Sequence, residues 1–255
     1  MTFSVEKFEF FLMIMIRVTA FMFTAPFFNI KEAPVRVKIG MGAIISYLIF
    51  YILPYEQLSY TGTLGFAVSA VKEAAAGLIL GFFANICTYI LAFSGQLLDM
   101  EMGFSMATEF DPQTRLSISV SGNIYSYAVM LILLVTRMHY YILNALVDSF
   151  SVIPLGKVNI NVSIYTVMVK FIADYFIIGF RIVLPMFAAM LIVNTILAIL
   201  AKVAPQMNMF VIGMQLKVLI GLLIMIVMVL MLGSVSDFIF KEMMDMMKAA
   251  AKYLE

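Results

Sequence analysis

The sequence predicts an all-α membrane protein with a single domain. Of its 255 residues, 64% are hydrophobic and 12% are charged, and the mean hydropathy is +1.06. A chain of this composition has too little polar surface to cover a soluble globule, so lipid or partner protein must cover most of it. The formal net charge of +1 argues against an electrostatic nucleic-acid binder, because no basic stripe exists to collect phosphates.

About six helical segments are expected from the uncharged stretches at residues 18–30, 39–55, 74–98, 116–136, 182–201 and 218–236. At ~1.5 Å per residue, a helix needs about 20 apolar residues to cross ~30 Å of hydrocarbon, so some of these segments are short. Pro26 and Pro185 interrupt two of them, which predicts kinked helices or helices packed against protein. Basic residues on alternate loops show no bias, so simple serpentine insertion is not expected.

Charges inside the apolar segments need partners, because an isolated charge in hydrocarbon is costly. Lys170, Asp174 and Arg181 share one helical face, which predicts a self-paired stripe in which Asp174 neutralises a base. Arg17 and Glu73 have no obvious local partner, so another helix or another chain must supply one.

Two further patterns concern packing. Gly77 and Gly81 follow Glu73 at four-residue spacing, which lets a second backbone approach closely. The last stretch, residues 237–255, is predicted to be an amphipathic helix that lies at an interface or on a neighbour. Its charged side carries Asp237, Lys241, Asp245, Lys248 and Lys252, and its apolar side carries Phe238, Met243, Met246, Met247 and Ala250.

A polar, methionine-rich insert separates two apolar segments at residues 94–123. It holds four acids and one base, which are Asp99, Glu101, Glu109, Asp111 and Arg115. The insert is either an ordinary exposed loop or a working part of the protein. Its glycines permit turns, and its methionine and phenylalanine side chains are soft apolar tips suited to packing on irregular surfaces.

No catalytic constellation is expected. Cys87 and His139 are the only residues of their types, so a disulfide within the chain, a histidine metal cluster and a charge-relay triad lack their parts. Asp99 and Glu101 are two residues apart and point away from each other on a helix. Phosphate-binding loops of the Walker type are absent. We expect no cofactor, no metal and no enzymatic activity.

Five motifs in chain order resemble the FliR family of flagellar biosynthesis proteins, and they cover nearly the whole length. The motifs are Arg17-Val-Thr-Ala20 with Ala25-Pro-Phe-Phe28 and Pro34; Glu73 with Gly77-Leu-Ile-Leu-Gly81; Gly95-Gln-Leu-Leu-Asp99 with Gly103 and Asp111-Pro112; Ser149-Phe-Ser-Val-Ile-Pro-Leu-Gly156; and Ala204-Pro-Gln-Met-Asn208 with Phe210, Gly213, Lys217 and Gly221. The last motif is the most specific.

The resemblance implies a subunit of the flagellar type III export gate, through which unfolded flagellar proteins pass. It implies a fold like a fusion of two partner proteins, with residues 1–170 FliP-like and residues 171–255 FliQ-like, and helices stacked obliquely in a helical pore complex. One copy of this chain would join FliP and FliQ, together with the FlhB and FlhA export components. The expected location is the bacterial inner membrane, at the flagellar basal body.

The resemblance also implies roles for individual residues. A plug that projects into the pore is expected around residues 100–115, and its residues are Met102, Gly103, Phe104, Met106, Phe110, Asp111 and Pro112. Helix packing or partner contacts are expected at Arg17, Glu73, Gly77, Gly81, Asp174, Arg181, Pro205, Gln206, Asn208, Phe210, Gly213 and Lys217.

Two other classes of function stay open from the residues alone. A secondary transporter would bind a small solute or ion at broken helices, at Glu73, Asp99 or Asp174. A transporter of this kind would be expected to contain internal sequence repeats, and the sequence shows no convincing repeat. An intramembrane enzyme would need a nucleophile and a base in facing segments.

Overall fold

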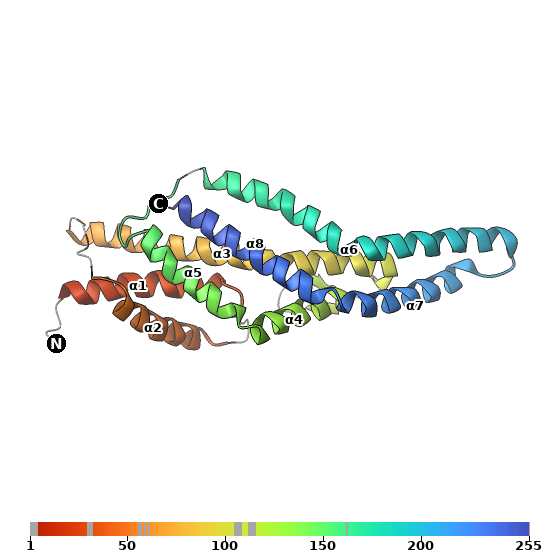
Figure 1. Ribbon diagram of the computed structural model, residues 1–255, viewed down its shortest axis with the longest axis horizontal. Coiled ribbons are helices and arrows are strands. Elements are labelled where there is room, and N and C mark those ends of the chain that lie inside the picture. Colours follow the sequence, from red (N-terminus) through yellow and green to blue (C-terminus); the bar gives the residue numbers. More distant parts are fainter. Residues whose placement is uncertain are drawn as a thin grey trace. The chain divides into compact units, whose positions relative to one another are not determined.

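The computed structural model describes residues 5–29, 33–55, 58, 60, 62–104, 109–111, 116–161 and 163–254, with the backbone alone at 109–111, 116–118 and 209. Within these residues the chain forms eight helices and one pair of short strands (Figure 1). The elements are α1 (Val5–Thr24), α2 (Val35–Ile52), α3 (Gly62–Met102), β1 (Glu109–Asp111), β2 (Leu116–Ile118), α4 (Val120–Val135), α5 (Met138–Val152), α6 (Ile164–Val203), α7 (Met209–Val229) and α8 (Leu232–Lys252).

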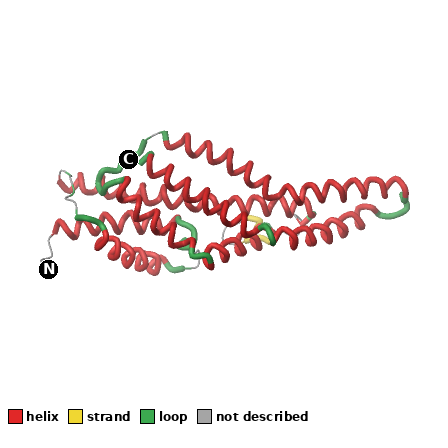
Figure 2. Tube along the Cα trace, in the orientation of Figure 1, coloured by secondary structure: helices red, strands yellow, loops and turns green. Residues whose placement is uncertain are grey.

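The predicted all-α membrane class is confirmed. In the described part of the chain, helices α2, α3, α6 and α7 are long and apolar enough to cross a membrane, and α4 with α5 adds a fifth span if this bent pair counts as one. Figure 2 shows how little of the described chain lies outside helices. The only strands among the described residues are the antiparallel pair β1 and β2, in which Phe110 lies opposite Ser117.

Helix boundaries differ from the uncharged stretches, because a charge does not end a helix. Helix α1 begins at Val5, includes Arg17 and ends at Thr24, two residues before Pro26. Phe27, which follows Pro26, has a left-handed φ of 69°. Pro26 therefore ends this helix instead of kinking it. Pro185 lies inside α6 as expected.

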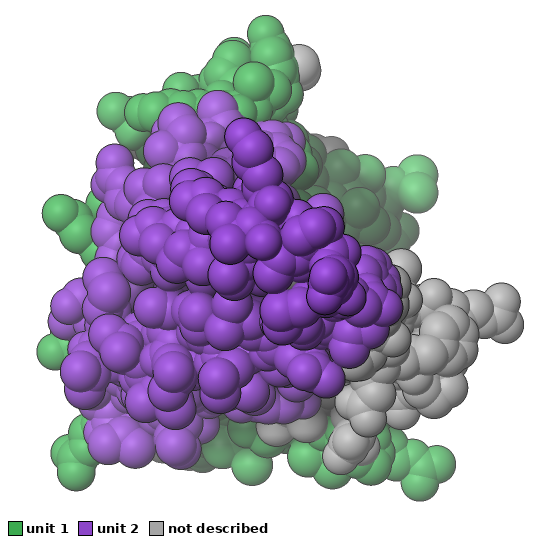
Figure 3. Space-filling view, turned by 90° about the vertical axis from the view of Figure 1, so that its right-hand side faces the viewer, with its two compact units in different colours: residues 1–87, 137–171, 240–255 green, residues 88–136, 172–239 purple. Residues whose placement is uncertain are grey.

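Two compact units make up the chain, and each is built from separated stretches (Figure 3). Unit 1 contains residues 1–87, 137–171 and 240–255, and unit 2 contains residues 88–136 and 172–239.

In unit 1, helix α1 packs closely on both α2 and α3. A Cβ added at Gly42 of α2 would lie 2.5 Å from the Thr19 methyl group. A Cβ at Gly77 would collide with the backbone oxygen of Arg17, and one at Gly81 would collide with the Thr24 hydroxyl. The predicted close approach of a second backbone to Gly77 and Gly81 is thus confirmed, and α1 of the same chain supplies that backbone.

The connection after α2 is tied to the start of α1 by two tyrosines. The Tyr55 hydroxyl donates a hydrogen bond to Glu6 Oε2 at 3.3 Å, and the Tyr60 hydroxyl donates one to Glu9. The bond to the Glu9 carboxylate raises the pKa of Tyr60, because it favours the protonated phenol.

The C-terminal helix α8 has the predicted amphipathic character. Met243, Met246, Met247 and Ala250 are buried, whereas Phe238 is partly exposed. The apolar side therefore packs on this chain's own helices. The end of the helix is held in unit 1, where the backbone N–H groups of Asn159 and Asn161 donate to the oxygens of Leu254 and Tyr253 at 3.1 and 3.2 Å.

In unit 2, the second half of α3 packs against α6. Phe93 lies among the rings of Tyr175, Phe176 and Phe180, with centroids 5.2–5.9 Å away. Gly179 leaves room for it, since a Cβ there would lie 2.5 Å from the Phe93 ring. Ser94 Oγ donates a hydrogen bond to the Gly179 oxygen at 3.2 Å.

Candidate functional site

Arg17 of α1 and Glu73 of α3 are partners of each other. Arg17 Nε and Glu73 Oε2 are 2.6 Å apart, and both side chains are 0% exposed. The two residues are 56 positions apart in the sequence. Local spacing therefore gave no sign of the pair, although the high cost of each isolated charge was visible.

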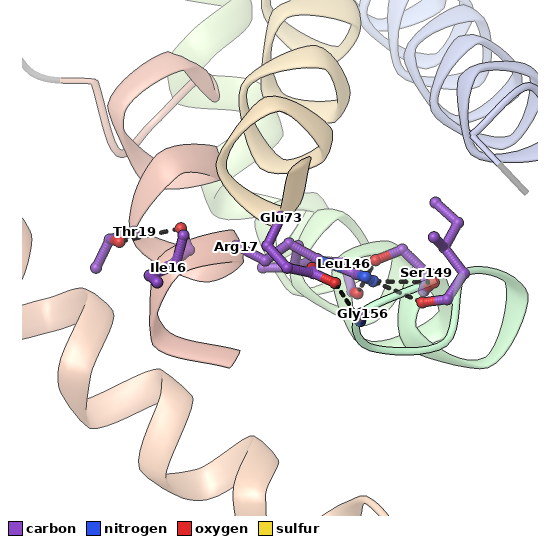
Figure 4. A network of polar contacts seen from close by, with 8 residues as sticks. Ile16, Arg17, Thr19, Glu73, Leu146, Ser149 and Gly156 are labelled. Atoms are coloured by element: carbon purple, nitrogen blue, oxygen red, sulfur yellow. Dashed lines mark hydrogen bonds and ion pairs between the residues drawn. The ribbon is translucent and has the colours of Figure 1, made fainter. Parts of the chain in front are cut away.

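The end of α5 completes a buried polar network around this ion pair (Figure 4). Arg17 Nη1 donates to the carbonyl oxygens of Ile153 at 2.9 Å and Ser149 at 3.4 Å. The Gly156 N–H donates to Glu73 Oε1 at 2.8 Å. Gly156 has a φ of +77°, a left-handed conformation that favours glycine.

This geometry explains the motif at residues 149–156. The guanidinium sits where the last carbonyls of α5 point, so the negative end of the helix dipole favours its charge. The ring of Phe150 lies 4.4 Å below the Arg17 guanidinium carbon, close enough for a cation–π contact. Arg17 Nη2 is buried without a hydrogen-bond partner among the described residues. The network fastens α1, α3 and the turn after α5 together.

Several residues of the predicted plug lie outside the described part of the chain, or are described by backbone only. Met106 and Pro112 lie outside it, and Phe110 and Asp111 belong to the backbone of β1. Gly103 has a φ of +82°, so it supplies the turn that was expected there. Phe104 is half-buried.

Met102 and the start of the insert need correction. Helix α3 runs on to Met102, so the break in helix begins at Gly103 instead of near residue 94. The Met102 side chain is 0% exposed and packs against Gly221 of α7, where a Cβ would lie 2.5 Å from the Met102 sulfur. Buried in this way, Met102 anchors the segment and does not form its tip.

The Ala204 to Lys217 motif covers the turn from α6 to α7 and the first turns of α7. Asn208 caps α7, its Oδ1 accepting a hydrogen bond from the Phe210 N–H at 3.2 Å. Phe210 is 71% exposed, and Pro205 and Gln206 are exposed beside it. Gly213 is buried against Leu197, and Lys217 is half-buried.

The predicted self-paired stripe on α6 is not formed. Within the described residues, no ion pair joins Asp174 to Lys170 or Arg181. A base one turn before an acid is the weaker orientation of this pair on a helix. Arg181 lies seven residues from Asp174, about 10 Å along the axis. Arg181 and Lys170 are exposed, and Asp174 is half-buried.

The sequence groups Asp99 with the acids of the polar insert, but Asp99 lies in α3 and is only 2% exposed. The His139 ring lies beside the Tyr140 ring at a tilt of 35°, with centroids 4.4 Å apart. The described residues contain no group of three or more His, Cys, Asp or Glu side chains that could hold a metal.

Comparison with known proteins identifies a family that matches the stretch of the chain in which these motifs lie. The sequence matches the family described as bacterial export proteins, family 1, over residues 8–243. It is similar to the flagellar biosynthetic protein FliR of Bacillus subtilis (strain 168), with 30% identity over 227 residues, 88% of this chain and 87% of that protein. It is also similar to the protein of the same name in Escherichia coli (strain K12), with 27% identity over 233 residues, 91% of this chain and 89% of that protein.

The buried pair leads to a stability prediction. Glu73→Ala leaves the Arg17 guanidinium buried without its counter-charge, and we expect it to lower the free energy of unfolding by about 3–5 kcal/mol. The double variant Arg17→Met with Glu73→Leu removes both charges and should lose less. Thermal unfolding of the detergent-purified protein measures both effects.

Lys72→Ala is the matched control, because Lys72 is the exposed neighbour of Glu73, and it should unfold like the wild type. A double variant less stable than Glu73→Ala would contradict the assignment of the loss to an uncompensated charge.

Proposed function

The chain belongs to the family of bacterial export proteins, family 1, and from this premise we propose that it is the FliR subunit of the flagellar type III protein export apparatus. The family match over residues 8–243 carries the proposal. The similar proteins from Bacillus subtilis and Escherichia coli bear the FliR name and are covered over most of their length. The apolar helices fit a multi-pass membrane protein, and the FliR relatives support a location in the bacterial inner membrane, at the flagellar basal body.

Its role would be to form part of the membrane gate through which unfolded flagellar proteins pass during flagellum assembly. The chain would form part of the pore wall and the segment that closes the pore, and associated export components would supply the energy for transport. Nothing in this role needs a nucleophile, a metal or a cofactor, and we assign the chain no catalytic activity.

The partners would be FliP and FliQ in a hetero-oligomer that holds one copy of this chain, with FlhB and FlhA as associated export components. The division into a FliP-like part at residues 1–170 and a FliQ-like part at residues 171–255 is part of this proposal. Large apolar side chains are exposed along α2, α6 and α7. Lipid or other membrane helices must cover them, which supports assembly with membrane partners.

The charges on α6 support a protein partner on one face of that helix. Asp174 and Arg181 are seven residues apart, so both lie on the same face, with Ile177 and Leu184 exposed along it. Arg181 stands near the middle of a 40-residue apolar helix. Such a charge is costly against lipid tails, whereas a partner helix with an acid opposite it would neutralise it.

The closure would be a plug made from the segment that begins at Gly103 and includes Phe104, Met106, Phe110, Asp111 and Pro112. Apolar tips can seal a pore by packing, and they release without breaking permanent bonds. The left-handed Gly103, the half-buried Phe104 and the buried anchor at Met102 support this proposal.

Deletion of residues 103–111 tests the plug. Because the deletion removes the apolar seal, we expect higher ion leakage through the assembled gate, measured as conductance of cells or vesicles that hold the complex. The control keeps the length and replaces only the acid Glu109 with Ala, which leaves the plug residues in place and should keep the gate closed. An unchanged leak after the deletion would count heavily against a plug.

The partner face of α6 gives a second prediction. Arg181→Glu places a like charge against the expected acid, and the loss of a buried interfacial charge pair costs about 2–5 kcal/mol. Much less FliP and FliQ should therefore co-purify with the tagged chain. Lys202→Glu, an exposed reversal in the last turn of the same helix, should leave the yield unchanged. Equal yields from both variants would refute a charged partner on this face.

A further inference from the structure

The end of α3 and the start of α4 are joined by a carboxylate. Asp99 Oδ1 accepts a hydrogen bond from the Ser121 N–H at 3.3 Å. Ser119 Oγ accepts one from the Gly122 N–H at 2.7 Å. Two of the N–H groups that the start of a helix leaves unpaired are thus satisfied, one by the helix's own cap and one by a residue of another helix.

The two backbones touch at the same place. A Cβ added at Gly95 would collide with Gly122 Cα, and one at Gly122 would lie 2.9 Å from Ser119 Oγ. Only glycine allows this approach without a shift of the helices. We call Gly95, Asp99, Ser119, Ser121 and Gly122 the neck.

Helix α7 supports the neck from a further side. The Tyr125 hydroxyl donates to the Met225 oxygen at 3.2 Å, and Ser121 Oγ lies 3.4 Å from the Met225 sulfur. One turn earlier on α7, Gly221 receives Met102. All of these residues belong to unit 2. The last residue of α3 and the first turn of α4 are therefore fixed on a common support.

The interaction of Asp99 with α4 is weaker than the polar network around Arg17. Among the described residues, Asp99 makes one hydrogen bond, of 3.3 Å, and its buried Oδ2 has no partner there. In the Arg17 network the ion pair is 2.6 Å long, Arg17 also donates to the Ile153 oxygen, and Glu73 also accepts from the Gly156 N–H. A single long hydrogen bond can be released at modest cost, whereas a buried ion pair cannot.

We propose that Asp99 is a positioning residue for the gate. Its carboxylate oxygen holds the first turn of α4 against the last turns of α3, and so sets the spacing between Met102 and Ser119, the two ends from which the segment between them starts and returns. The proposal rests on the proposed function, because the spacing matters only if that segment closes a pore. Asp99 acts here as a hydrogen-bond acceptor, so its charge is not the required property.

Three single variants in the assembled complex test this role, with ion leakage per purified complex as the readout. Asp99→Ala removes the acceptor, and we expect the leak to rise about fivefold, the shift of an opening equilibrium that loss of a helix cap produces. Asp99→Asn keeps an acceptor oxygen for the Ser121 N–H and should stay near the wild-type leak. Glu101→Ala changes a neighbouring acid outside the neck and should behave as wild type.

A merely structural role would lower the yield of complex without raising the leak of each complex. Wild-type leakage of assembled Asp99→Ala overturns the proposal, and so does an Asp99→Asn variant that leaks as much as Asp99→Ala. If Asp99→Ala fails to assemble, Ser119→Ala replaces it. That variant removes the other cap of the same neck and must leak for the proposal to stand.

The deletion of residues 103–111 separates this proposal from the function on which it rests. If the deletion variant leaks and Asp99→Ala does not, only the role of Asp99 is overturned. If the deletion variant does not leak, the plug is overturned, and the positioning role of Asp99 with it.

Discussion

The buried contact between Arg17 and Glu73 is the constraint on which the rest of unit 1 depends. Neither charge could stay in an apolar interior without the other, so α1 and α3 must meet at this level. The contact between α1 and α3 leaves no room for a side chain on α3 one turn after Glu73, and Gly77 occupies that position. It also requires the turn after α5 to present an N–H to Glu73, which the left-handed Gly156 makes possible. Residues that look unrelated in the sequence thus serve one contact.

The described residues of unit 2 are held by close backbone contacts and methionine packing, and no ion pair is found among them. The backbone of Gly95 lies directly against the backbone of Gly122, and the Met102 side chain fills the space beside Gly221. Such contacts are held by dispersion and hydrogen bonds of ordinary strength. A closure that must open for each passing chain is expected in a region of this kind, and a permanent scaffold in a region like unit 1.

The all-α membrane class was predictable because composition and long uncharged runs report directly on burial in lipid. Pairings between distant residues were not predictable. Arg17 and Glu73 lie 56 positions apart, and the sequence shows only that each charge is costly in an apolar segment without a partner. The same limit applies to Asp99: α3 continues through residues of mixed polarity, so the sequence makes this helical residue look like an acid of a polar insert. The stripe on α6 was wrong because helical spacing shows that charges share a face, but not that they bind each other. The motifs that resemble FliR indicated which residues matter, and the structure supplies the reason for the arginine, the glutamate and their glycines.

The composition of the complex that a tagged copy of this chain brings out of the membrane in mild detergent tests the central claim most directly. A gate subunit is expected to isolate together with two unlike small membrane proteins, FliP and FliQ, each in excess over a single copy of this chain. Isolation of the chain alone or as a homo-oligomer, as expected of a secondary transporter, would contradict the account.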